Sequence, residues 1–114
     1  MSAKEIESIS LKFNELQTKL QESLSNRQKL ETQNQENLIV LKEFNNLSDD
    51  SKIYKLTGSV LLPQDFNDAK VNVEKRLEFI KSEISKVEDL IKTTQTELET
   101  TRNSLIQLRT ATGQ

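Results

Sequence analysis

Helix-breaking residues are nearly absent from this chain, and their positions divide it into two long segments. Pro63 is the only proline, and Gly58 and Gly113 are the only glycines. Residues 1–57 and 64–112 therefore contain no residue that strongly interrupts a helix. This distribution predicts two long helices that are joined by a short non-helical connection.

The second segment carries a heptad pattern of apolar residues. Eleven positions, spaced alternately by three and four residues, form a seam, and nine of them are apolar. These positions are Val73, Leu77, Ile80, Ile84, Val87, Ile91, Thr94, Leu98, Thr101, Leu105 and Leu108. A repeat of about 3.5 residues that continues over such a length is typical of a coiled coil.

The first segment repeats the pattern less regularly, with eight apolar residues at twelve seam positions. These positions are Ile6, Ile9, Phe13, Leu16, Leu20, Ser23, Arg27, Leu30, Asn34, Asn37, Leu41 and Phe44. The polar exceptions lie between residues 23 and 37, where we expect Leu24 and Leu38 on the adjacent column to compensate in part. Antiparallel pairing of the two seams would place Ser23 beside Thr94.

The middle of the chain has the composition of a β hairpin. Residues 52–62 read KIYKLTGSVLL, a run of β-branched, aromatic and aliphatic residues around one glycine. This pattern predicts two short strands that are hinged near Thr57 and Gly58. Pro63 is expected to end the second strand, and residues 64–68 are expected to cap the second helix and supply its acidic first turn.

Because the connection is short, the helices should fold back on each other. The predicted fold class is therefore all-α dominated, an antiparallel two-helix coiled-coil hairpin with a short β hairpin between the arms. The arms are predicted at residues 1–47 and 64–111, and the β hairpin at residues 52–62. Residues 1–114 are expected to form a single domain, with Phe44 of the first arm beside Val73 of the second.

Composition and charge exclude several classes of function. Only 33% of the residues are hydrophobic and 4% are aromatic, which is thin material for the core of a compact enzyme. The 18 acidic and 16 basic residues nearly balance, so we expect neither nucleic acid nor an anionic membrane as a partner. No apolar stretch approaches the roughly 20 residues of a membrane helix, and the first residues lack a signal-peptide core. We expect a cytoplasmic protein.

No group of residues suggests catalysis, a metal site or a bound cofactor. The chain has neither Cys nor His, which excludes thiolate nucleophiles, disulfides and the commonest zinc ligands. Asp49 and Asp50 lie between serines, as in a solvated loop. Asp65 and Asp68 fit the first turn of a helix better than a metal site. We therefore expect no enzyme, no metal and no cofactor.

Two features of the sequence point to the binding of other polypeptides. The first is the apolar surface of the predicted hairpin, which two strands alone cannot bury. Its residues are Ile53, Tyr54, Leu56, Val60, Leu61 and Leu62, arranged around the turn at Gly58. We expect this surface to pair with strands of other subunits. The alternative is that the hairpin folds onto its own arms through Phe44, Phe66 and Phe79.

The second feature is that apolar seam residues continue to the free ends of both arms. These residues are Ile6, Ile9, Phe13, Leu105 and Leu108. If the ends splay, such side chains are available to hold another chain without sequence specificity. Ordinary closure of the zipper predicts the same spacing, so the sequence leaves both interpretations open.

Residues 52–84 closely resemble the hairpin and the start of the second helix in β-type prefoldin subunits, above all the eukaryotic subunit-six branch. The matching residues are Tyr54, Lys55, Leu56, Gly58, Val60, Leu61, Leu62, Gln64, Lys75, Arg76, Leu77 and Ile80. Chain length and both heptad arms also agree, so the resemblance covers nearly the whole chain. The run 63–68 departs from the more basic or glycine-containing stretch of that family.

This resemblance implies a subunit of an ATP-independent molecular chaperone. In that family, two α-type and four β-type subunits form a heterohexamer whose hairpins join into a central β platform. The arm ends bind unfolded actin and tubulin and pass them to the cytosolic chaperonin. The hairpin residues above would then serve assembly, and the arm-end residues would bind clients. The rival interpretation is a coiled-coil tether or scaffold that binds one folded partner.

Overall fold

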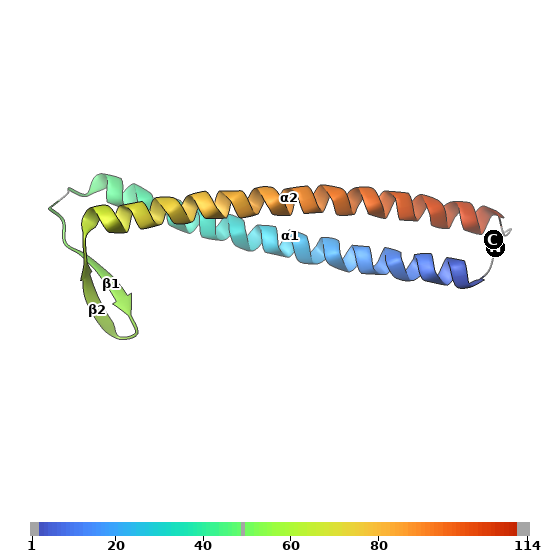
Figure 1. The fold of residues 1–114 in the computed structure, drawn as a ribbon, viewed down its shortest axis with the longest axis horizontal. Coiled ribbons are helices and arrows are strands. Elements are labelled where there is room, and N and C mark those ends of the chain that lie inside the picture. Colours follow the sequence, from blue (N-terminus) through green and yellow to red (C-terminus); the bar gives the residue numbers. More distant parts are fainter. Residues whose placement is uncertain (1–2, 49, 112–114) are drawn as a thin grey trace. The chain divides into compact units, whose positions relative to one another are not determined.

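The computed structural model describes residues 3–48 and 50–111. In this part of the chain, helix α1 spans Ala3–Asn46 and helix α2 spans Phe66–Ala111. Strand β1 spans Ile53–Thr57 and strand β2 spans Val60–Gln64. The two strands follow α1 and precede α2 in the chain, and they pair antiparallel as a hairpin (Figure 1). The predicted fold class is therefore confirmed.

The chain forms two compact units, each with a segment of both helices. The terminal unit comprises the described parts of residues 1–28 and 85–114, and the hairpin unit comprises those of residues 29–84. Within each unit, the segment of α1 lies beside the segment of α2 and runs antiparallel to it (Figure 1). Each unit therefore has a helix-helix core of its own.

The predicted heptad positions form the core of the terminal unit. Leu16 and Ser23 of α1 are buried, and α2 contributes a row of buried side chains. This row consists of Val87, Ile91, Thr94, Thr101, Leu105 and Leu108. Thr94 has no exposed surface (0%), and its hydroxyl donates a 2.7 Å hydrogen bond to the Leu90 carbonyl oxygen. The polar group in the middle of this seam is therefore satisfied within its own helix.

Arg27 occupies a seam position of α1, yet its side chain reaches solvent. Its Nη2 lies 3.3 Å from Oε1 of Glu88 on α2, within the terminal unit. A long aliphatic stem allows such a residue to leave the seam while its charged group stays in water. Because both side chains remain nearly half exposed, this ion pair contributes little to stability.

An aromatic and aliphatic cluster forms the core of the hairpin unit. Its buried members are Phe44, Phe66, Ala69, Val73 and Leu77, and Leu41 and Ile53 pack against them. The rings of Phe44 and Phe66 meet edge to face with centroids 5.5 Å apart, a favourable aromatic geometry. The cluster joins the end of α1, the start of α2 and the base of β1, so it fixes the point from which the hairpin projects.

Polar residues in the middle of α1 remain in the seam. Asn34 and Asn37 are half-buried, whereas Leu24 and Leu38 are exposed. Leu38 nevertheless lines a groove with Leu41 and Leu77, so it adds partial cover beside Asn34.

The prediction that Pro63 ends the second strand is also wrong. Strand β2 continues through Pro63 to Gln64, and Pro63 pairs with Tyr54. Counted from the turn, this pair is one whose members exchange no backbone hydrogen bonds, so the missing N–H of proline costs the ladder nothing. The hairpin thus reaches two residues beyond the predicted end at residue 62.

Asp65 caps the second helix. Its Oδ1 accepts a 3.0 Å hydrogen bond from the backbone N–H of Asp68, and α2 begins at Phe66. This is the capping role that the sequence indicates for residues 64–68. In the preceding loop Asp50 is exposed, whereas Asp49 lies outside the described residues.

Candidate interaction sites

The hairpin closes through a two-residue turn at Gly58 and Ser59. Thr57 pairs with Val60 on either side of it. Gly58 has a φ of +64°, a region that residues with a Cβ rarely adopt, whereas φ of Ser59 is not positive. Glycine at the first of two turn positions matches a type II′ turn, whose twist suits a tight hairpin.

The turn sets the alternation of hydrogen-bonded pairs along the ladder. Because two residues separate Thr57 from Val60, that pair exchanges backbone hydrogen bonds, and so does every second pair from it. The intervening pairs, Leu56 with Leu61 and Tyr54 with Pro63, direct their backbone groups outward. Paired residues share one face, so these residues also form a wholly apolar face of the sheet.

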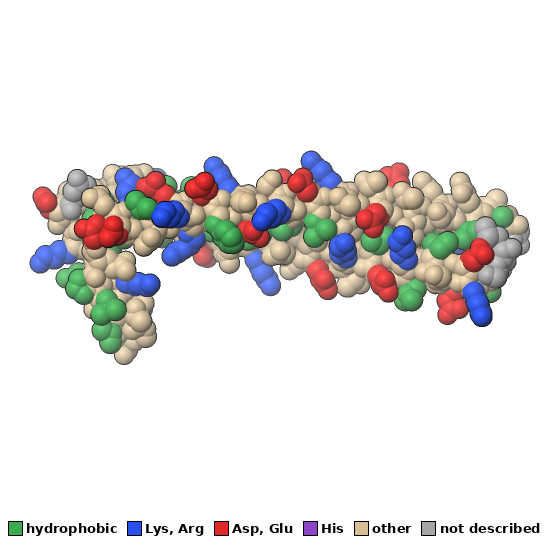
Figure 2. All heavy atoms as spheres, in the orientation of Figure 1, with side chains coloured by type: hydrophobic (Ala, Val, Ile, Leu, Met, Phe, Trp, Pro, Cys, Tyr) green, Lys and Arg blue, Asp and Glu red, His purple; other side chains and the backbone are tan. Residues whose placement is uncertain are grey.

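Most of the predicted assembly residues are exposed. Tyr54, Leu56, Val60, Leu61 and Leu62 all present much of their side chains to solvent, with Leu56 66% exposed. Hydrophobic side chains accordingly cluster on the projecting hairpin in the space-filling view (Figure 2). A two-stranded sheet with so much exposed apolar surface is marginal by itself.

Ile53 is the one predicted apolar assembly residue that is not exposed. It is half-buried and packs against the core cluster that contains Phe44 and Phe66. The alternative interpretation, in which the hairpin folds onto its own arms, therefore holds for this residue at the base of β1. Phe79, which that interpretation also includes, is 63% exposed and is not a member of that cluster.

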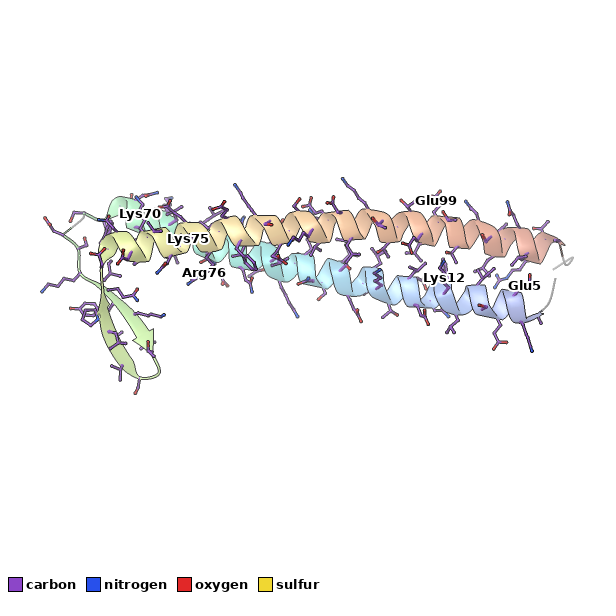
Figure 3. All side chains as sticks on the ribbon, viewed as in Figure 1. Glu5, Lys12, Lys70, Lys75, Arg76 and Glu99 are labelled. Atoms are coloured by element: carbon purple, nitrogen blue, oxygen red, sulfur yellow. The ribbon has the colours of Figure 1, made fainter. Side chains whose placement is uncertain are left out.

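A cluster of basic residues follows the hairpin on the first turns of α2. Lys70, Lys75 and Arg76 project there (Figure 3), and Glu74 lies among them in the sequence. Nη1 of Arg76 donates a 3.3 Å hydrogen bond to Oδ1 of Asn37, which ties this part of α2 to α1 inside the hairpin unit. The mixture of charges is typical of a solvated helix face.

The predicted client-binding residues lie in the seam of the terminal unit. Leu105 and Leu108 are buried, and Ile6, Ile9 and Phe13 are half-buried. This burial fits a closed zipper rather than splayed ends. The buried pair on α2 has little surface for another chain in this arrangement.

Two exposed apolar residues near the arm ends are not predicted by the heptad pattern. Leu11 is 60% exposed and Ile106 is 52% exposed. Both lie between seam positions in the sequence, and charged side chains such as Glu5, Lys12 and Glu99 project from the same helices (Figure 3). The signal that could have revealed them is an apolar residue on the outer face of a heptad repeat.

No helix within residues 3–48 and 50–111 combines the length and the apolar character that crossing a membrane requires.

One strand pair that connects two long helices in the chain is the fold of the β subunits of prefoldin. The crystal structure of the prefoldin β subunit from Thermococcus strain KS-1 superposes with a TM-score of 0.80. The match covers 94% of this chain and 91% of that one. Sequence identity is 19%, so this comparison establishes the fold alone.

Sequence comparisons extend the likeness to the family. The family model described as "Prefoldin subunit" matches residues 7–111. Prefoldin subunit 6 of Saccharomyces cerevisiae is 53% identical over 97 residues, which cover 85% of each chain. Prefoldin subunit 6 of Homo sapiens is 39% identical over 98 residues, covering 86% of this chain and 76% of the human one. The chain belongs to the prefoldin family, and the β-type, subunit-six resemblance seen in the sequence is confirmed.

Membership of the family fixes the general function. Prefoldin subunits are chaperones, and they act together with other prefoldin subunits in one complex.

Proposed function

We propose that this chain is one β-type subunit of a heterohexamer with two α-type and four β-type subunits. Residues 1–114 act in it as one prefoldin-type domain. The complex works in the cytoplasm without ATP, metal or cofactor and catalyses no reaction. It holds unfolded actin and tubulin and passes them to the cytosolic chaperonin. The subunit six proteins that this chain is similar to support the proposal.

The observation that carries the proposal is the exposed apolar hairpin. Its residues Leu56 and Leu61 pair across the ladder and face solvent together. Burial of each such side chain is worth about 1.5 to 3 kcal/mol, so strands from neighbouring subunits gain substantially by covering them. The proposed assembly residues are Ile53, Tyr54, Leu56, Gly58, Val60, Leu61 and Leu62.

We propose that clients are held at the arm ends by several weak apolar contacts. Ile6, Ile9 and Phe13 keep part of their surface exposed for such contacts, whereas Leu105 and Leu108 become available only when the two helix ends separate. Contacts of this kind are individually weak, and arms of several subunits sum them through avidity. Release then requires no ATP, only competition by the chaperonin.

The experiment that tests assembly co-expresses the chain with its partner subunits and changes the hairpin. Leu56→Glu with Leu61→Glu places two charges where the interface would desolvate them, so we expect loss of the complex. Phe79→Glu is the matched control, because Phe79 is an apolar residue of the hairpin unit with similar exposure. Native mass spectrometry reads the outcome. A complete complex that contains the doubly charged hairpin would refute this role.

A further inference from the structure

The two edges of the hairpin differ in their capacity to accept another strand. In an antiparallel ladder, residues of the pairs without mutual hydrogen bonds direct N–H and C=O groups outward. On β1 these residues are Tyr54 and Leu56, and on β2 they are Leu61 and Pro63. None of these outward groups has a hydrogen-bond partner within the described residues.

Pro63 makes the difference, because it has no backbone N–H. The β1 edge offers two N–H donors and two C=O acceptors at regular spacing, at Tyr54 and Leu56. The β2 edge offers a donor at Leu61 alone, since Pro63 contributes only its carbonyl. Proline at a sheet edge is a recognised obstacle to pairing with a further strand. A strand that adds along β1 therefore satisfies a complete set of backbone groups.

An apolar face of the sheet reaches the β1 edge. On one face of the sheet Ile53 packs against the core cluster of the hairpin unit, whereas Val60 and Leu62 on the same face are exposed. The opposite face is formed by Tyr54, Leu56, Leu61 and Pro63, so it is apolar throughout. A strand that joins β1 extends this apolar face if every second residue of that strand is apolar. The side chains and backbone groups of Tyr54 and Leu56 thus act on the same partner.

From this asymmetry we propose that the hairpin accepts a strand of a neighbouring prefoldin subunit along its β1 edge, through the backbone of Tyr54 and Leu56. The β2 edge, which contains Pro63, makes the lesser contact. This inference rests on the proposed assembly role and specifies which edge of the hairpin receives its partner. If every subunit pairs in this way, the hairpins join with one fixed orientation, each through its β1 edge.

The sharpest test removes single N–H groups without changing a side chain. Replacing Leu56 by its α-hydroxy acid analogue turns its amide into an ester and removes the outward donor of β1. The same replacement at Leu61 removes the outward donor of β2, and it is a matched control because the residue type and pair are the same. The assay measures the affinity of the modified chain for the other subunits by native mass spectrometry.

We expect the ester at Leu56 to weaken association by up to about tenfold, the effect of one lost hydrogen bond, and the ester at Leu61 to have a smaller effect. Equal effects, or a larger effect at Leu61, would overturn the proposal. A chain with both amides intact that forms no complex at all would instead refute the proposed function.

Amide hydrogen exchange on the unmodified chain gives a second readout that requires no variant. In the isolated chain the amides of Tyr54, Leu56 and Leu61 should exchange rapidly, because they point outward. In the complex, Tyr54 and Leu56 should gain strong protection. Protection confined to Leu61 would show that the partner joins β2, and it would contradict the assignment.

Discussion

The hydroxyl of Thr94 is the most deeply buried polar group of the terminal unit's seam. It donates a hydrogen bond to the Leu90 carbonyl oxygen. That oxygen also accepts a helical backbone hydrogen bond, so it keeps a partner when the hydroxyl is removed. Thr94→Val should therefore stabilise the chain by about 1 kcal/mol, because burial of a hydroxyl costs more than burial of a methyl group. Denaturant unfolding measures the change.

Thr93 offers the matched control. Its hydroxyl makes the same kind of bond, to the Asp89 carbonyl oxygen at 3.0 Å, but the residue is exposed. Thr93→Val should change the free energy of unfolding by less than about 0.5 kcal/mol. Equal effects of the two substitutions would show that burial in the seam is not the cause.

The cap of α2 depends on one carboxylate. Asp65→Ala removes the acceptor of the Asp68 N–H and should lower the free energy of unfolding by about 1 kcal/mol. The comparison is Asp50→Ala, which changes an exposed loop residue that precedes β1. If the two variants unfold at the same denaturant concentration, the cap has no energetic role.

At this scale the sequence predicts burial well and exposure poorly. All eleven predicted seam positions of α2 are buried or half-buried, because heptad spacing and helical phase are tied together. Arg27 departs from its column in α1 because its length lets the charge reach Glu88. Leu11 and Ile106 were missed because a residue outside the seam leaves no periodic signal.

Among the elements, the hairpin departs most from its predicted form. Residue composition correctly indicates two strands around Gly58, but the rule that proline ends a strand fails at Pro63. The turn decides which residue pairs exchange backbone hydrogen bonds, and therefore which N–H groups the ladder requires. Residue composition does not specify the length of that turn. The helices, by contrast, follow directly from the absence of breakers and from the capping residues.

The turn itself predicts a measurable asymmetry. Gly58→Ala should destabilise the hairpin by about 1 to 2 kcal/mol, because a Cβ is strained at a φ of +64° even though nothing lies near it. Ser59→Ala is the control, since φ of Ser59 is not positive. The measurement is the denaturant midpoint for dissociation of the assembled complex. A more harmful Ser59→Ala would contradict the turn described.

The ends of the helices give a test of client binding that leaves the seam intact. Leu11→Ser with Ile106→Ser removes exposed apolar surface, so assembly and helix content should remain while suppression of aggregation of denatured actin falls severalfold. Ile39→Ser, another exposed aliphatic change but in the hairpin unit, should leave suppression unchanged. Full activity of the double variant would show that Leu11 and Ile106 add nothing to client binding, and that the proposed residues Ile6, Ile9 and Phe13 act without them.

For the whole molecule, the sequence alone predicts the fold of two long helices joined by a β hairpin. Most apolar side chains of the hairpin are exposed in the isolated subunit, whereas Leu105 and Leu108 at the arm ends are buried. A two-stranded apolar sheet gains stability by joining other strands, and this argument supports the proposed assembly role of the hairpin. The central claim is therefore about assembly.

The most direct test is the mass of the intact complex that is purified with this chain from its own cells, with each component identified. We expect six small coiled-coil subunits, two of them the longer α-type chains, with this chain present among the β-type subunits. A monomer, a homodimer or a complex with one large folded partner would contradict the account and would favour a coiled-coil tether.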